Sequence, residues 1–169
     1  GNDPDSRSPF EVTVPRDGEY GFTLRARSGA GLAADPPQPG EKPSIVVVVD
    51  QTPPVAQLLA ARQGQGADLN KILIHWKASD KQLADKPVTL AYATDLAGPW
   101  KAIDDWLPNT GSYSWTVDSG MPPRMYLRLT VRDAAGNETR VESSQPVVVD
   151  LSKPTARIVD VEAMPGVQY

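Results

Sequence analysis

Apolar and polar residues alternate with a period of two wherever a pattern can be followed along this chain. Residues 125–132 read MYLRLTVR, and residues 21–28 read GFTLRARS. In both stretches apolar residues recur at every second position, and most of the residues between them are Arg or Thr. This period is typical of β-strands with one buried face and one solvated face. The sequence therefore predicts an all-β fold.

The same two stretches also match one another at a separation of 105 residues. Phe22 matches Leu127, and Leu24 matches Leu129. Each stretch is followed by a glycine-containing turn, SGAGL at 28–32 and DAAGN at 133–137. A shared strand followed by a shared turn indicates an internal repeat.

The repeat continues on both sides of these stretches. SPFEVTVP at 8–15 resembles GSYSWTVD at 111–118, and VVVVDQTPP at 46–54 resembles PVVVDLSKP at 146–154. Strand, strand, glycine turn, valine-rich strand and a linker that begins with Asp and contains Pro four residues later thus occur twice in the same order. A period of roughly 100 residues is the size of an immunoglobulin-like sandwich.

The register of the repeat sets the expected domain limits. Residues 54–150 form one complete unit, which we expect to be a seven-stranded antiparallel β-sandwich of the immunoglobulin-like or fibronectin-like kind. Residues 1–50 hold the last three strands of a preceding unit, and residues 151–169 hold the first strand of a following unit or a strand that docks back. The seven strands are expected at 55–62, 71–79, 88–94, 99–104, 113–117, 124–132 and 146–150.

The partial first unit raises a physical question, because three strands alone leave an apolar face and open edges. We expect that face to be covered by another chain, which predicts intermolecular pairing of residues 1–50, or by a strand at 155–161 that folds back. The apolar residues expected on it are Phe10, Val12, Phe22, Leu24 and Val47.

Composition narrows the function classes. The net charge of −4 argues against a nucleic-acid partner, which would favour a basic surface. The absence of cysteine excludes disulfides and thiolate metal sites and leaves both the cytosol and a bacterial exterior open. No apolar run is long enough to span a bilayer, and no leader precedes the first strand, so we expect any secretion signal to lie outside these residues.

Several short motifs carry a family resemblance. They are Trp76, ASD at 78–80, YAT at 92–94, GPW at 98–100, NTGSYSW at 109–115, LRL at 127–129, DAAGN at 133–137 and both linkers. With them the chain resembles the tandem immunoglobulin-like or fibronectin type III-like modules of bacterial extracellular and cell-surface proteins, well over 71–155 and in part over 10–54. The resemblance implies an extracellular, non-catalytic spacer or adhesive module whose partners are neighbouring domains of the same kind.

The sequence offers little support for catalysis. His75 is the only histidine, and it lies on the polar phase of its strand, away from any nucleophile motif. The adjacent pair Asp104 and Asp105 lacks the facing geometry of a glycosidase pair. We therefore expect no enzyme activity in this chain.

Aromatic residues suggest an alternative function. Trp76 and Trp115 fall on inward phases and are expected in the core, whereas Trp100 follows a Gly-Pro turn and Trp106 falls in an expected loop. Trp100, Trp106 and Tyr113 are candidate ligand-binding residues for carbohydrate or for a protein surface, or they cover one end of the sandwich. A carbohydrate-binding module and an accessory domain of an extracellular hydrolase are the alternative functions.

Topology predicts one candidate metal site. In such a sandwich, the loop after the second strand and the last hairpin turn lie at the end where the linker enters. Asp50, Asp80, Asp133 and Asn137 are therefore expected to meet there, as oxygen ligands of the kind that Ca²⁺ prefers. The alternative is that each Asp closes a local Asx-turn. The first turn carries Ser28 and Leu32 in place of Asp and Asn, so such a site would not recur in every unit.

Overall fold

The computed structural model describes residues 11–152, 157, 159 and 160 of the chain, and this part is all-β. No helix among these residues has the length and apolar character needed to cross a membrane. The first two strands are β1 (Gly18–Phe22) and β2 (Ile45–Val49). The others are β3 (Val55–Gln63), β4 (Lys71–Ser79), β5 (Leu83–Ala93), β6 (Lys101–Leu107), β7 (Ser112–Thr116), β8 (Arg124–Asp133), β9 (Glu138–Glu142) and β10 (Val147–Val148), with a 3-10 turn, η1, at Gly66–Asp68.

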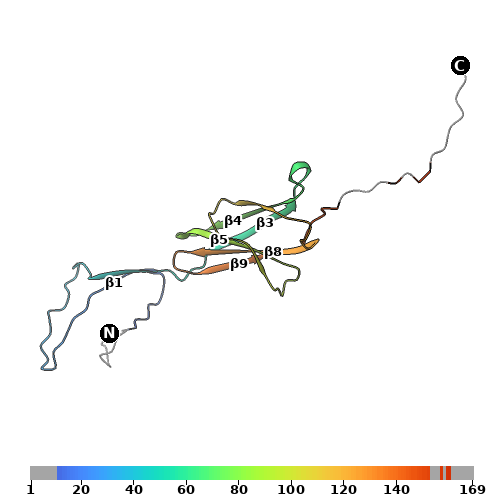
Figure 1. Cartoon of the computed structure of the whole chain (residues 1–169). Coiled ribbons are helices and arrows are strands. Elements are labelled where there is room, and N and C mark those ends of the chain that lie inside the picture. The colour runs from blue at the N-terminus through green and yellow to red at the C-terminus, as the bar shows by residue number, and fades with distance from the viewer. Residues whose placement is uncertain (1–10, 153–156, 158, 161–169) are drawn as a thin grey trace, which may run out of the picture.

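Strands β3 to β10 form a two-layered body in the middle of Figure 1. One antiparallel sheet has the order β3-β4-β7. The other has the order β6-β5-β8, and two more strands pair with β8. Strand β9 pairs with residues 128–132 of β8, and β10 pairs with Arg124 and Met125. The expected all-β class is confirmed, and the arrangement of the sheets is consistent with a sandwich.

The core lies between the two sheets and is built mainly from alternate residues of three strands, with Val117, Val147 and Val149 completing it. Strands β4, β5 and β8 contribute Ile72, Ile74, Trp76, Val88, Leu90, Met125, Leu127, Leu129 and Val131. Trp76 is 2% exposed, and its indole N–H donates to Asn109 Oδ1 over 3.0 Å. Trp115 is half-buried and lies against Tyr92, with 5.1 Å between the ring centroids. Both tryptophans therefore occupy the inward positions that alternation predicts.

Strand β9 is the element that the sequence did not predict. Its residues read ETRVE, and Val141 is the only apolar one, so the alternation is too weak to mark a strand. Residues 146–150, expected as the last strand, pair with β8 only at Val147 and Val148. The body thus contains eight strands, where seven were expected.

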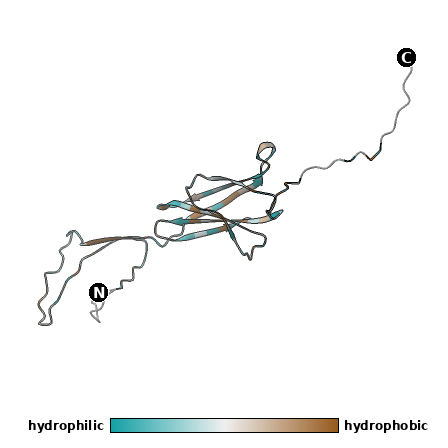
Figure 2. Ribbon diagram, viewed as in Figure 1, coloured by the Kyte–Doolittle hydropathy of each residue, from teal (hydrophilic) through white to brown (hydrophobic). Residues whose placement is uncertain are grey.

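Strands β1 and β2 form a separate antiparallel hairpin beyond one end of the body (Figure 1). Of the three strands expected in residues 1–50, β2 lies where the valine-rich strand was expected, whereas β1 overlaps the strand expected at 21–28 only at Gly21 and Phe22. Residues 11–17 belong to no strand, and residues 8–10 of the expected first strand lie outside the described residues. The hydrophobic residues of β2 stand out in Figure 2, and Ile45, Val46, Val47 and Val48 are all exposed.

The hairpin repeats the pairing of β8 with β10. Strand β1 lies 105 residues before β8, and β2 lies 100 residues before β10. With these separations the Cα partners match pair for pair: Tyr20–Val47 with Met125–Val147, and Glu19–Val48 with Arg124–Val148. The internal repeat seen in the sequence is therefore also a repeat of strand register.

The turn after each first strand is repeated as well. Ser28 N–H donates to Leu32 O over 2.7 Å, and Asp133 N–H donates to Asn137 O over 3.1 Å. The glycines Gly31 and Gly136 have φ values of 86° and 96°, a region that favours glycine. The isolated bridge between Arg27 and Ala33 likewise matches the pairing of Arg132 with Glu138.

After β10 the chain continues through Asp150 and Ser152. The strand expected at 155–161, either as the start of a following unit or as a back-docked strand, falls largely outside the described residues. Val159, which is described, is 91% exposed and belongs to no strand.

Candidate metal centre

The linker between β2 and β3 is held by hydrogen bonds from both sides. On the body side, Asn137 Nδ2 donates to Asp50 O over 3.0 Å, and the Thr139 hydroxyl donates to Pro54 O. On the hairpin side, Asp17 accepts hydrogen bonds from the Gln51 N–H and the Thr52 hydroxyl. The joint between the hairpin and the body is therefore fixed by specific contacts.

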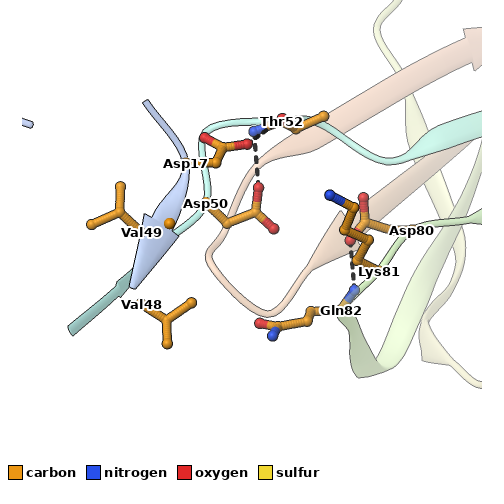
Figure 3. A pocket seen from close by; sticks show the side chains of 9 residues that line it. Asp17, Val48, Val49, Asp50, Thr52, Asp80, Lys81 and Gln82 are labelled. Carbon is orange, nitrogen blue, oxygen red and sulfur yellow. Dashed lines mark hydrogen bonds between the residues drawn. The ribbon is translucent and has the colours of Figure 1, made fainter. Parts of the chain in front are cut away.

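Three carboxylates meet at this joint. Asp50 comes from the linker, Asp80 directly follows β4, and Asp133 ends β8. One carboxylate oxygen from each lies within 4.8 Å of those from the other two. In Figure 3 the side chain of Asp50 points across the cleft toward Asp80. Antiparallel topology explains the meeting, because β4 and β8 both run toward the end at which the linker enters.

Asp133 is the most deeply placed of the three, at 1% exposed. Its Oδ1 accepts the backbone N–H of Asn137 over 2.8 Å, and its Oδ2 accepts Asn137 Nδ2 over 2.7 Å. Burial raises the pKa of Asp133, but the hydrogen bonds from Asn137, together with those from the backbone N–H groups of Gly136 and Ala135, outweigh burial and hold that pKa below its ordinary value. Asp133 is therefore a buried carboxylate that stays ionised.

Asn137 joins two of the three segments. Its amide nitrogen donates to the Asp133 carboxylate and also to the backbone carbonyl of Asp50. The sequence placed Asn137 among the metal ligands, and in the structure its amide nitrogen connects the acids. Its position in the turn after β8 makes that double contact possible.

The Asx-turns of the alternative interpretation are present too. Asp50 Oδ1 accepts the Thr52 N–H over 3.0 Å, and Asp80 Oδ1 accepts the Gln82 N–H over 2.7 Å. Among the described residues, the Oδ2 atoms of Asp50 and Asp80 have no hydrogen-bond donor. The local turns are compatible with a shared cation, because each turn uses only one carboxylate oxygen and leaves the other oxygen available as a ligand.

A cleft of about 200 Å³ opens beside the cluster, between the hairpin and the body. Residues of the hairpin, the linker and the body line it: Asp17, Gly18, Val48, Val49, Asp50, Thr52, Asp80, Lys81 and Gln82. Lys81 is the only basic residue among them, against three acids. The hydrogen bonds from Thr52 and Gln51, together with the nearby charge of Lys81, lower the pKa of Asp17. The cleft is thus acidic and belongs to the joint.

Sequence reasoning missed Asp17. It lies directly before β1 and contacts the linker from the hairpin side. In the second copy of the repeat, 105 residues later, the position that corresponds to Asp17 is Pro122, so the repeat did not point to Asp17. The dipeptide Asp17-Gly18 at a strand start is a turn signal, and it was the one indication available.

The candidate aromatic residues have different partners. Tyr113 is in β7, and its hydroxyl donates to Asp104 Oδ2 over 2.8 Å. Burial and this hydrogen bond raise the pKa of Tyr113. Trp100 is half-buried and Trp106 is 52% exposed, and both contact arginines of β8. Trp106 was expected in a loop, and the structure places it within β6, where an irregular strand hides the alternation.

The residues considered for catalysis lie apart from the joint. His75 is half-buried in β4, opposite Ala60 and Ser112 of the neighbouring strands. Asp104 accepts the Tyr113 hydroxyl at the edge of β6.

No protein-family model and no curated protein matches this chain. Its function therefore has to be inferred from its own residues and geometry.

Proposed function

We propose that the chain is a non-catalytic structural module of a larger repetitive protein, in which it serves as a spacer or adhesive unit. The observation that carries this proposal is the repeated register, in which β1 pairs with β2 as β8 pairs with β10. Two units joined by a short linker are what a tandem array contains. The resemblance to modules of bacterial surface proteins suggests an extracellular or cell-surface location.

The fold proposed for each unit is the immunoglobulin-like or fibronectin type III-like sandwich. A three-stranded sheet, β3-β4-β7, faces a sheet that contains β6, β5, β8 and β9. Seven strands in two facing antiparallel sheets fit such a module, with β9 and β10 acting together as the interrupted last strand. Topology of this kind supports many binding and spacing roles, so the function rests on the joint and on the surface.

The β1–β2 hairpin is then the carboxyl-terminal part of a preceding unit. In the complete unit, Leu127 and Val147 are buried by the other strands, whereas Phe22 is half-buried and Val47 is 41% exposed. We expect a set of strands like residues 55–117 to cover the hairpin, supplied by the parent chain or by a second chain.

The joint is proposed to bind a divalent cation, most suitably Ca²⁺. Asp50, Asp80 and Asp133 bring three negative charges within 4.8 Å of one another, and like charges at that distance repel. A cation ligated by carboxylate oxygens at the usual 2.3–2.6 Å removes the repulsion and links the linker to two loops of the following unit. The cation would therefore set the angle between consecutive units.

A calcium titration tests this joint. Wild-type protein is unfolded thermally in chelator and in millimolar Ca²⁺, and the cation is expected to raise Tm, because binding at 100 times Kd stabilises the folded state by about 2.7 kcal/mol. Asp80→Asn should abolish the shift. Asp85→Asn, which changes an exposed acid of β5 outside the cluster, should keep it. An unchanged Tm in wild type, or an equal shift in Asp80→Asn, would remove the metal from the proposal.

The spacer role has a separate test that does not depend on the metal. Backbone ¹⁵N relaxation compares the tumbling of residues 18–22 and 45–49 with that of the body. If the joint is ordered as the contacts of Asn137 and Asp17 indicate, the hairpin tumbles with the body, and Asn137→Ala releases it. Independent tumbling of the wild-type hairpin would contradict an ordered spacer.

A carbohydrate-binding function is the second candidate. The exposed indole of Trp106 favours it, whereas the hydroxyl of Tyr113 is already used in a hydrogen bond to Asp104. The accessory domain of a hydrolase would need such a surface as well.

A further inference from the structure

The outer face of the β5-β8-β9 layer is built from charged and aromatic side chains. Strand β8 sends Leu127, Leu129 and Val131 into the core, so the residues that alternate with them, Arg128 and Arg132 among them, point to the opposite face. Strand β9 pairs with β8 along this layer (Figure 1). This face lies away from the interior, on the side of β8 opposite to the core residues.

Two rows of side chains cross this face. In the first row, the Arg128 guanidinium lies 3.9 Å from the centre of the Trp100 ring. Its Nε and Nη2 donate to Glu142 Oε1 over 3.0 and 2.7 Å. Trp100, Arg128 and Glu142 thus form a continuous Trp–Arg–Glu row.

The second row repeats this order near the end of β8. The Arg132 guanidinium lies 5.0 Å from the centre of the Trp106 ring, and its Nη2 lies 3.2 Å from Glu138 Oε1. Arg140 Nη2 donates to Glu138 Oε2 over 2.9 Å, and its side chain is 64% exposed. This row is more open to solvent than the first, because Trp106 is 52% exposed whereas Trp100 is half-buried.

The backbone at Trp106 is in a conformation that bulky residues rarely adopt. Its φ is 60°, in the left-handed region. The pairs Val88–Leu107 and Leu90–Asp104 leave Asp105 and Trp106 both opposite Thr89, so β6 carries a bulge here. Bulges at sheet edges redirect side chains, and this one presents the indole beside Arg132. Burial of the Trp106 ring does not explain this strained backbone, because half of the ring is in solvent. Residues held in such conformations cluster at functional sites, so the exposed ring of Trp106 indicates a function.

We propose that this face binds a carbohydrate chain, an inference that rests on the second candidate function and gives it a binding surface. The exposed indole of Trp106 offers an apolar platform for the C–H face of a pyranose ring. Arg132, Arg140 and Glu138 surround it with planar donors and acceptors that suit sugar hydroxyls. The two rows are about 13 Å apart, because Arg128 and Arg132 are separated by four residues of β8 at roughly 3.3 Å each. A chain of a few sugars is long enough to contact both rows.

The charges favour a sugar over a protein partner. Glu142 offsets Arg128, and Glu138 offsets one of two arginines, so the face is nearly neutral. A stable protein interface needs about 800 Å² from each partner with an apolar centre, and this face offers one exposed aromatic ring. A glycan needs only the ring and a few oriented polar groups.

Affinity electrophoresis tests the proposal. The full chain is run in native gels that contain a soluble neutral β-glucan, a xylan or a polyuronate, all with chelator so that the joint metal plays no part. Retardation by at least one polysaccharide is expected, and Trp106→Ala should weaken it at least tenfold. Leu69→Ala, at an exposed apolar residue beside η1, is the matched control and should bind as wild type does.

A second variant protects the test against misfolding. Arg140→Ala changes an exposed side chain outside the core and should also weaken binding, with an unchanged unfolding curve. Retardation by none of the three polysaccharides would overturn the proposal. Equal retardation of wild type, Trp106→Ala and Arg140→Ala would overturn it as well.

Discussion

The hairpin β1–β2 and the pair β8–β10 have the same register and the same following turn, yet very different burial. Leu129 is 0% exposed, and its counterpart Leu24 is 84% exposed. Val147 is 7% exposed, and its counterpart Val47 is 41% exposed. Local sequence is thus sufficient to set pairing and turn geometry, whereas burial requires the strands of the opposing sheet.

The two regions differ in one further way. The first separation in the repeat is 105 residues and the second is 100, so the first unit has five additional residues between its turn and its last strand. That stretch, 34–44, contains Pro36, Pro37, Pro39 and Pro43. Proline has no N–H to donate to a strand ladder, so no counterpart of β9 forms there beyond the single bridge at Ala33.

The largest expected difference between the regions is in core truncation. Leu129→Ala should lower the free energy of unfolding of the body by about 2–5 kcal/mol, because it leaves a cavity in a closed core. Leu24→Ala should change it by less than about 0.5 kcal/mol, because that side chain is already in solvent. Urea unfolding followed by tryptophan fluorescence measures both. Equal losses would mean that the first unit shares the core of the body.

The turn residues test what distinguishes the two turns. Asn137→Leu installs the residue found at the matching position 32 and removes the amide nitrogen that donates to both Asp133 and Asp50. It should destabilise the body by about 1–3 kcal/mol, because the buried carboxylate loses a partner. The reverse change, Leu32→Asn, should leave the unfolding midpoint in urea unchanged. A silent Asn137→Leu would show that the amide contacts contribute nothing.

The glycines test what the two turns share. Gly136→Ala forces a β-carbon into the left-handed region and should cost about 1–2 kcal/mol in the thermal unfolding of the body. Gly31→Ala carries the same local strain, but the body should melt at the wild-type temperature, because that turn lies in the other unit. Circular dichroism during heating separates the two. A matching loss in Gly31→Ala would indicate that the units unfold together.

The smallest effect concerns the second linker, where Asp150 forms a turn like that of Asp50. The hydroxyl and N–H of Ser152 lower the pKa of Asp150 below 3.8. Ionised Asp150 therefore stabilises this turn above that pH, and the contribution is lost as the pH falls through the lowered pKa. A carbon-detected NMR titration should find Asp150 below 3.8, and Ser152→Ala should raise it. An Asp150 pKa that Ser152→Ala does not move would exclude the hydrogen bond as the cause.

Alternation was enough to predict the buried strands from the sequence. Ile72, Ile74 and Trp76 recur at every second position and form the interior side of β4. It failed at β9, where Val141 is the only apolar residue, and at Trp106, where a bulge breaks the period. Strands with weak alternation are recognised only once their partner strand is known.

The candidate joint was partly accessible from topology. The order of the strands places the ends of β4 and β8 together, so the meeting of Asp80 and Asp133 followed from the fold class. The contributions of Asp17 and Thr139 did not, because they depend on how the hairpin and the linker pack, and no periodicity encodes such packing.

The hydrogen bonds between the β8–β9 hairpin and the linker have a mechanical consequence. Asn137 holds the carbonyl of Asp50, and Thr139 holds that of Pro54, so both ends of the linker are fastened to the same hairpin. Tension that enters along the chain at Asp50 is then shared between β3, in one sheet, and the β8–β9 hairpin, in the other. An array of such units would pass a pulling force from sheet to sheet across each joint, and would not peel its first strand away.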